Sequence, residues 1–330
     1  MDVQLRLFTD PAAAPGAVVV GAVPPTDRIA GLASRLPRSV RLGTSSWSFP
    51  GWAGLVYDRL ATEDLLAREG LAAYASHPLF RTVGLDRTWY RPLTADQFRA
   101  YATVVPDDFR FLVKADRVLT SPLDPDSTVM RSRNPRFLDA AYATEKVVRP
   151  MLDGLAEKAG VLLFQFPPIA PNLVGGRSAF LQALHRFLTS LPKGPVYAIE
   201  LRTPAFLTES YADLLERTKA THCYNVHPSM SPLKRQFAVV PPYYQRALVV
   251  RWMLHSGMEY ETARERYHPF DRMVDEDPVA RSQIATAVLD VTVAERPAFV
   301  IANNKAEGSA PLSLSLLAER ICDWTPPQPR

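Results

Sequence analysis

Lysine, arginine, glutamate and glutamine side chains stand near the ends of several short apolar runs in this sequence. Lys114, Gln165, Glu200, Arg202 and Arg251 each lie in the last residues of such a run. Runs of this length and composition are typical of buried strands. Amines and carboxylates that converge can exchange protons, and paired guanidiniums can bind an anion. Further polar residues near the ends of such runs, or in the loops just beyond them, are Asp86, Asn303, Asn304 and Glu307.

These residue types suggest a division of roles. Glu200 would be a general acid or base whose pKa is set by Lys114 and Arg202. Lys114 would instead be a Schiff-base nucleophile if a dry pocket lowered its pKa. Arg202 and Arg251 would bind an anionic group, and Gln165, Asn303 and Asn304 would orient hydroxyls. The alternative is a structural ion-pair network. Replacement of Glu200 by Gln would abolish turnover in the first case and destabilise the fold in the second.

The elements that must position these residues are eight strands alternating with helices. This order predicts repeated βαβ units, and eight parallel strands close a barrel. An open doubly wound sheet is the alternative, but the sequence contains no GxGxxG or GxxxxGK[ST] loop. We therefore expect a single-domain (β/α)8 TIM barrel over residues 38–325, preceded by an N-terminal arm and short helix over 1–37. The predicted strands are Arg41–Ser46, Thr82–Asp86, Arg110–Ala115, Gly160–Phe166, Val196–Arg202, Thr221–His227, Ala247–Met253 and Pro297–Asn304. The predicted helices after the first strand are Thr62–Ser76, Thr94–Val104, Asn134–Lys158, Ser178–Leu191, Thr208–Lys219, Pro278–Ala294 and Pro311–Cys322.

Side chains alternate along a strand, so Glu200 and Arg202 share a face with Ala198. In a barrel this face points inward, while Ile199 and Leu201 face the helices. The active sites of such barrels lie at the carboxyl ends of the strands. Buried polar groups cost several kcal/mol each when unpaired, so they must satisfy one another, water or a ligand.

The loops add aromatic and basic side chains. Trp47 opens the aromatic segment Trp47–Trp52, which either stacks on a ligand or plugs the barrel. A long loop follows the third strand, another follows the sixth, and Met258–Val274 is expected to be a solvated extra helix that can close over the mouth. The basic residues of the two loops are Arg131, Arg133, Lys234 and Arg235.

Composition limits the class of protein. The net charge is +4, and apolar residues make up 47% of the chain, as in ordinary globular proteins. No apolar run approaches the roughly 18 residues of a membrane span. Two distant cysteines, Cys223 and Cys322, predict reduced thiols and a cytoplasmic protein. The six histidines form no HxH or HExxH motif, so we expect no metal and no cofactor.

Several segments resemble the DUF72 (YecE-like) family, in the same order. They are Arg41–Phe49, Thr82–Tyr90, Phe109–Ala115, Leu162–Pro168, Ala198–Pro204, Val249–Arg251 and Asn303–Gly308. The resemblance implies a TIM barrel with no established reaction. By position in these motifs it also implies the candidate residues Trp47, Lys114, Gln165, Glu200, Arg202, Arg251, Asn303, Asn304 and Glu307.

This chain departs from the family pattern at four places, one of which is Asp86, where the family tends to have Asn. Gly84 stands where the family usually has Glu, Met253 where it usually has His, and Lys305 where Asp or His is more frequent. The changes at Gly84 and Met253 remove acid–base groups.

Two functions follow from these residues. The first is an enzyme that acts on a polyhydroxylated or phosphorylated small molecule, with Glu200 and Lys114 as catalytic groups. The alternative is a non-catalytic binding protein for an anionic or nucleic-acid ligand. No basic run or nucleic-acid-binding motif supports the nucleic-acid ligand, so the small molecule is favoured.

Overall fold

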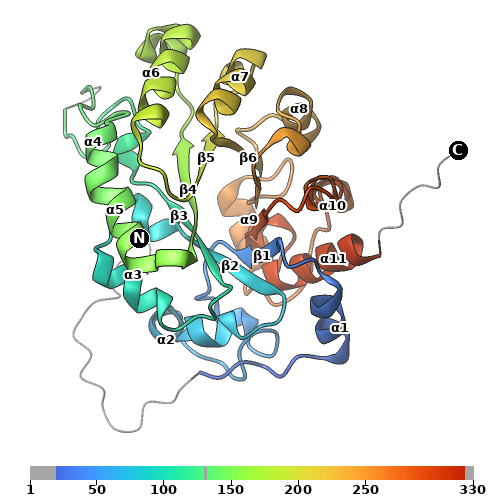
Figure 1. The fold of residues 1–330 in the computed structure, drawn as a ribbon. Coiled ribbons are helices and arrows are strands. Elements are labelled where there is room, and N and C mark those ends of the chain that lie inside the picture. The colour runs from blue at the N-terminus through green and yellow to red at the C-terminus, as the bar shows by residue number, and fades with distance from the viewer. Residues whose placement is uncertain (1–19, 130–131, 324–330) are drawn as a thin grey trace, which may run out of the picture.

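Eight parallel strands close into a barrel in the computed structural model, which describes residues 20–129 and 132–323 (Figure 1). Each strand pairs with the next, and β8 pairs with β1. The predicted (β/α)8 barrel is therefore confirmed, as are all eight predicted strands, each within about two residues. The strands are β1 (Val40–Thr44), β2 (Phe80–Leu85), β3 (Arg110–Lys114), β4 (Ala159–Phe166), β5 (Val196–Leu201), β6 (Thr221–Val226), β7 (Leu248–Trp252) and β8 (Ala298–Ala302).

The two faces of the strands belong to different hydrophobic clusters. Ala198 and Val249 lie inside the barrel in a cluster completed by Leu112, Val161, Leu163, Cys223, Met253, Phe299 and Ile301. Ile199 and Leu201 lie in the larger cluster between the strands and the helices. The predicted alternation is confirmed, and it places Glu200 on the inner face.

The helices surround the barrel (Figure 1). Two of them begin at a threonine whose side chain accepts a hydrogen bond from the third residue beyond it, at Thr62 and Thr94. The helices after β1 are α2 (Glu63–Ala75), α3 (Ala95–Ala102), α4 (Ala140–Tyr142), α5 (Arg149–Leu155), α6 (Gly176–Ser190), α7 (Glu209–Thr218), α8 (Leu233–Val239), α9 (Tyr260–Tyr267), α10 (Pro278–Thr292) and α11 (Ala310–Cys322).

Three helical segments differ from the prediction, and one of them is the extra helix predicted over Met258–Val274, which spans only Tyr260–Tyr267. The loop after β6 contains α8, whose two turns are too short to show a periodic pattern in sequence. Gln236 holds α8 to β6, because its amide accepts from the backbone N–H of Asn225 and donates to its carbonyl oxygen. The predicted helix Asn134–Lys158 begins only at Ala140, because Leu138 has a positive φ of 55° and Asp139 caps α4.

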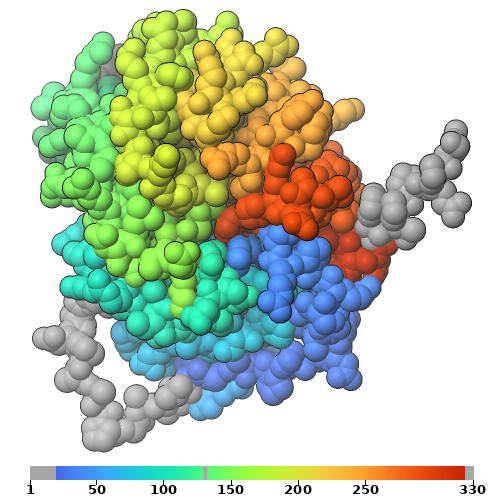
Figure 2. Space-filling model, in the orientation of Figure 1, coloured from blue at the N-terminus to red at the C-terminus, as the bar shows by residue number. Residues whose placement is uncertain are grey.

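The N-terminal arm is described only from residue 20, and the part of it over residues 1–19 lies outside the described residues. The predicted short helix is α1 (Asp27–Arg35), capped by Thr26. It packs beside α11, as Figures 1 and 2 show by the contact of blue and red segments. Two ion pairs join them, Arg28 to Glu319 and Arg35 to Asp323.

Candidate functional site

Glu200 lies at the centre of an ion-pair network at the carboxyl ends of the strands. Its carboxylate is fully buried and accepts hydrogen bonds from Arg202 Nε at 2.8 Å and from an Arg251 terminal nitrogen at 2.7 Å. Gln165 accepts from both guanidiniums with Oε1, at 3.3 Å from Arg202 and 2.9 Å from Arg251. The other terminal nitrogen of Arg251 lies 3.3 Å from Asp86. Five of the predicted site residues therefore meet in one connected network.

The two guanidiniums determine the ionisation of Glu200. Burial alone would raise the pKa of this carboxyl group, but Arg251 and Arg202 hold the pKa well below its usual range. Burial likewise opposes the charge of Arg251, while Glu200 and Asp86 raise the pKa of that guanidinium. A carboxylate that stays ionised between two arginines is poorly suited to donate or accept a proton near neutral pH. Glu200 is better suited to orient the two guanidiniums.

Lys114 is the titratable side chain at the mouth whose pKa burial shifts to a value suited to proton transfer. It is 8% exposed, and its Nζ lies 4.4 Å from the centre of the Trp89 ring. Burial is the main cause that lowers the pKa of Lys114 to about 8; the positive charges of Arg251 and Arg202 act in the same direction, and Asp86 and Glu200 oppose it. A lysine with such a pKa exchanges protons readily near neutral pH.

Asn303 belongs to a second group of contacts at the end of β8. Its amide nitrogen donates to Ser45 Oγ at 2.8 Å, and its carbonyl oxygen accepts from Lys305 Nζ at 3.3 Å. The Lys305 ammonium also lies 4.4 Å from the Tyr260 ring centre and 5.9 Å from that of Phe270. The expected extra helix, α9, thus supplies an aromatic side chain to this part of the mouth.

Positive charge exceeds negative charge in these two groups. His227 adds none near neutral pH, because burial, together with the positive charge of Arg202, lowers its pKa to about 4. A site with this balance favours an anionic ligand. The basic side chains are Lys114, Arg202, Arg251 and Lys305, and the carboxylates are Asp86 and Glu200.

Three residues predicted to bind a ligand have other contacts. Trp47 is 2% exposed and packs in the main core, with its indole N–H bonded to the Leu66 carbonyl oxygen, so it is not open to stacking. Asn304 Oδ1 accepts from the Trp52 indole and from the Ala310 backbone, which fixes the start of α11. Trp47 and Asn304 thus make structural contacts in the described residues, and their predicted binding roles stay predictions.

Glu307 is the third of these residues. Its carboxylate is fully buried, pairs with Arg281 and accepts from the backbone N–H of Asp277 at 2.7 Å. It therefore faces α10 instead of the mouth network, because the turn after Asn304 directs it away from the barrel. These contacts are structural, and its predicted binding role stays a prediction.

The departures from the family pattern have local explanations. Met253 belongs to the apolar cluster inside the barrel, where it covers the interior beside Arg251. A Cβ at Gly84 would lie 3.3 Å from the Cα of Ser45, the residue that follows β1. The backbone at the end of β1 therefore approaches β2 closely, at a position where the family usually has the larger side chain of Glu. Lys305 supplies a cation in place of an acid or imidazole.

Three mouth residues were not singled out as candidates from sequence. Trp89 follows β2 in a short 3₁₀ turn (Asp86–Trp89), and Lys305 was noted only as a departure. Asn225 lies on β6 opposite Arg251 on β7; the sequence places it among the polar residues at the strand ends, but no binding role was assigned to it. Within the described residues, no three His, Cys, Asp or Glu side chains cluster as metal ligands, and no helix is long and apolar enough to cross a membrane.

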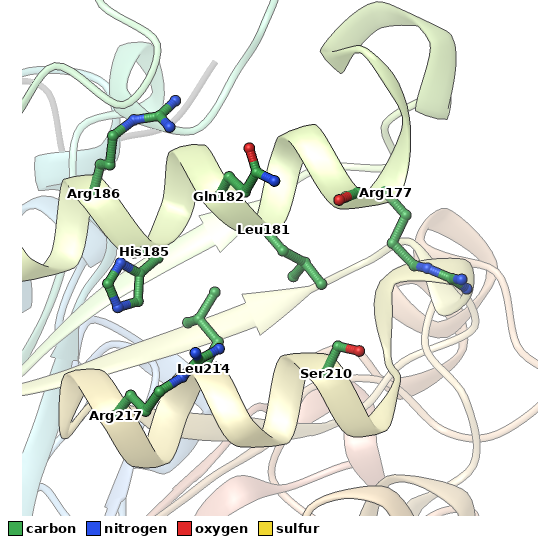
Figure 3. A pocket seen from close by; sticks show the side chains of 9 residues that line it. Arg177, Leu181, Gln182, His185, Arg186, Ser210, Leu214 and Arg217 are labelled. Atoms are coloured by element: carbon green, nitrogen blue, oxygen red, sulfur yellow. The ribbon is translucent and has the colours of Figure 1, made fainter.

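A separate basic groove lies on the outside of the barrel, between α6 and α7 (Figure 3). Its volume is about 590 Å³, and Leu181 and Leu214 from the two helices face each other across it. Arg177 also lines a neighbouring groove with Arg235 from α8. Arg131, predicted to be a contact residue, lies outside the described residues. The polar residues of the first groove are Arg177, Ser178, Gln182, His185, Arg186, Ser210 and Arg217.

The fold and the mouth network define a (β/α)8-barrel protein with a cation-rich polar cluster at the carboxyl ends of its strands. The family model described as "Protein of unknown function DUF72" matches residues 41–329, so the chain belongs to the DUF72 family. No curated protein matches the chain.

Two crystal structures of DUF72 proteins resemble the chain. The Enterococcus faecalis V583 protein is 19% identical with a TM-score of 0.56, covering 87% of this chain and 96% of its own. The Thermotoga maritima MSB8 protein is 21% identical with a TM-score of 0.56, covering 85% and 98%. At this identity, the likeness supports the fold.

Proposed function

We propose that the protein is an enzyme that acts on a small, hydroxylated anion, such as a phosphorylated one, at the barrel mouth. The observation that supports this best is Lys114, a buried amine whose pKa is lowered to about 8 beside two guanidiniums. With that pKa, about a tenth of the amine is neutral at pH 7, which is enough for a general base. The roles suggested by sequence thus change, with Lys114 as the proton-exchanging group and Glu200 as the residue that orients the arginines.

The neighbouring side chains support acid–base chemistry. Arg202 is the more exposed of the two arginines bound to Glu200, with 19% of its side chain accessible against 3% for Arg251. Arg202 is therefore placed to bind the anionic group, while Arg251 stabilises negative charge that develops as Lys114 removes a proton. Asn303 and Lys305 would hold the other end of the substrate. This chemistry uses side chains alone, without a metal or cofactor. We also propose a cytoplasmic location, which the two free thiols favour.

Proton exchange with solvent tests the proposal directly. The protein is incubated in D₂O with a panel of aldose phosphates, ketose phosphates and sugar acids, and loss of carbon-bound proton signals is followed by NMR. We expect exchange in at least one compound, at the carbon next to its carbonyl group, with a rate that rises with pH to an inflection near the Lys114 pKa of about 8. Exchange with no member of the panel would contradict the proposal.

The alternative function, binding of an anionic polymer such as nucleic acid, is favoured by the groove between α6 and α7. Three arginines and a histidine line it, and no carboxylate does. No Phe, Tyr or Trp side chain lines it, which limits base stacking there.

Salt-dependent binding tests this alternative. If the groove binds a single-stranded oligonucleotide, fluorescence anisotropy would show weaker binding at 200 mM than at 50 mM salt, with a slope of about −0.7 per phosphate contacted. Replacing Arg177, Arg186 and Arg217 by Ala would lower that slope, and Arg68→Ala on α2 is the matched control because it is also exposed. Equal binding by the triple variant and wild type would exclude the groove.

A further inference from the structure

Asn225 is a buried amide on the inner face of β6. It shares that face with Cys223 inside the barrel and lies in register with Arg251 on β7. Its backbone N–H and carbonyl are both bonded to the Gln236 side chain, which fixes the residue in place. The residue is 1% exposed. Its side chain therefore lies in the same polar layer as Glu200 and Arg251.

The amide of Asn225 has no hydrogen-bond partner among the described residues. Neither Oδ1 nor Nδ2 is bonded, and the Nε of Arg251 is also unpaired. The nearby acceptors are already used, because both oxygens of Glu200 bind arginines and Gln165 Oε1 accepts two hydrogen bonds. Buried amides are nearly always paired, and leaving one unpaired is unfavourable. The buried, unpaired amide of Asn225 is therefore available to bind a ligand.

The donors and acceptors of these groups select a type of ligand. The Asn225 amide both donates and accepts, whereas Arg251 Nε only donates. A hydroxyl group matches them, since its oxygen accepts from a donor while its proton goes to the amide oxygen. The more exposed Arg202 is then left for a negative charge.

We infer that Asn225 binds a hydroxyl of the substrate, and that the site takes small anions whose hydroxyl stands next to a carboxylate or phosphate-bearing carbon. The inference rests on the anion-binding mouth of the proposed function. The hydroxyl enters the polar layer and the anionic group stays nearer the opening, beside Arg202.

Matched pairs of anions test the inference by isothermal titration calorimetry. Lactate is compared with propionate, and 2-hydroxypropyl phosphate with propyl phosphate. The wild-type protein is expected to bind the hydroxylated member of at least one pair about tenfold or more tightly, because a site built to bind a hydroxyl rejects the analogue without it. The pair that shows the preference distinguishes carboxylate from phosphate ligands.

Replacement of Asn225 by Leu, which has nearly the same size, is expected to abolish this preference and to leave propionate or propyl phosphate binding within about twofold. The melting temperature of this variant is expected to equal or exceed that of wild type, because an unpaired amide is removed. Asn225→Ala provides the same readout if the Leu variant does not fold.

Three outcomes would overturn the inference. They are equal affinity for both members of each pair, no binding of any of the four anions at 10 mM, or a preference that survives in both variants. A lower melting temperature together with an unchanged preference would assign the amide to a buried water. If proton exchange depends on Lys114 but the protein shows no preference for hydroxylated anions, only the inference about Asn225 is refuted. If the protein prefers hydroxylated anions but catalyses no proton exchange, only the proposed catalytic function is refuted.

Discussion

Lys114→Met is expected to lower the turnover found in the exchange assay by about 10²–10⁴-fold, the usual contribution of a positioned acid or base. Methionine keeps a flexible side chain of similar length against Trp89 but cannot take a proton. The initial rate of deuterium incorporation measures the effect. Lys193→Met is the matched control, because Lys193 is exposed and lies outside the mouth.

Lys114→Arg separates charge from proton transfer. A guanidinium keeps the positive charge but cannot be deprotonated near neutral pH, so anion binding should persist while turnover falls as far as in the Met variant. Full turnover in the Arg variant would show that Lys114 acts only as a cation. Borohydride trapping with a carbonyl substrate distinguishes the Schiff-base alternative, because reduction would leave a covalent adduct on Lys114.

The lowered pKa of Lys114 also predicts a dependence of stability on pH. The folded state prefers the neutral amine, with a pKa of about 8 against an ordinary value of 10.5. The corresponding stability is present above the unfolded pKa and is lost as the pH falls through the folded pKa. Between these values, wild type should therefore gain stability relative to the Met variant as the pH rises.

The convergence of the mouth residues was predictable from sequence because it follows from topology. Each strand was marked by an apolar run, and alternation placed Glu200 with Ala198 on the inner face. Once the strands close a barrel, residues at their carboxyl ends must approach one another. The same argument correctly brought Gln165 and Arg251 to Glu200.

The residues beyond the strand ends were harder to predict, because turns have no periodicity that tells where a side chain points. Asn303 stays at the mouth, but the next residues, Asn304 and Glu307, turn toward α11 and α10. Trp47, also just past a strand, inserts below α2 and bonds to Leu66. The aromatic residues of the segment Trp47–Trp52 therefore indicate core packing.

The role of Glu200 could not be predicted from sequence, since it depends on which atoms pair. Sequence placed Glu200 near Lys114 and Arg202 and left both catalytic and structural roles open. In the structure, each carboxylate oxygen of Glu200 accepts a hydrogen bond from a different arginine. That arrangement fixes the charge of Glu200, so the two roles now predict different results for one substitution.

Glu200→Gln is expected to destabilise the fold by about 3–5 kcal/mol, because it leaves the guanidinium of Arg251 buried without its main counter-charge. Arg251 is 3% exposed, and its remaining partners are Gln165 and the more distant Asp86. For a chain of this size, the melting temperature should fall by about 5–15 °C in calorimetry. Glu209→Gln, an exposed position at the start of α7, is the matched control.

Acid titration and a compensated variant show whether this loss comes from charge pairing. The Glu200 pKa is lowered in the folded state, so its stabilisation is present above the ordinary pKa of 4.5 and is lost as the pH falls below it. The difference between wild type and Glu200→Gln should therefore shrink in acid. Replacing Glu200, Arg202 and Arg251 together by Leu, Leu and Met should recover stability, because the three charges that pair with one another are removed together. An unchanged melting temperature for Glu200→Gln, combined with lost turnover, would instead return Glu200 to the role of acid or base.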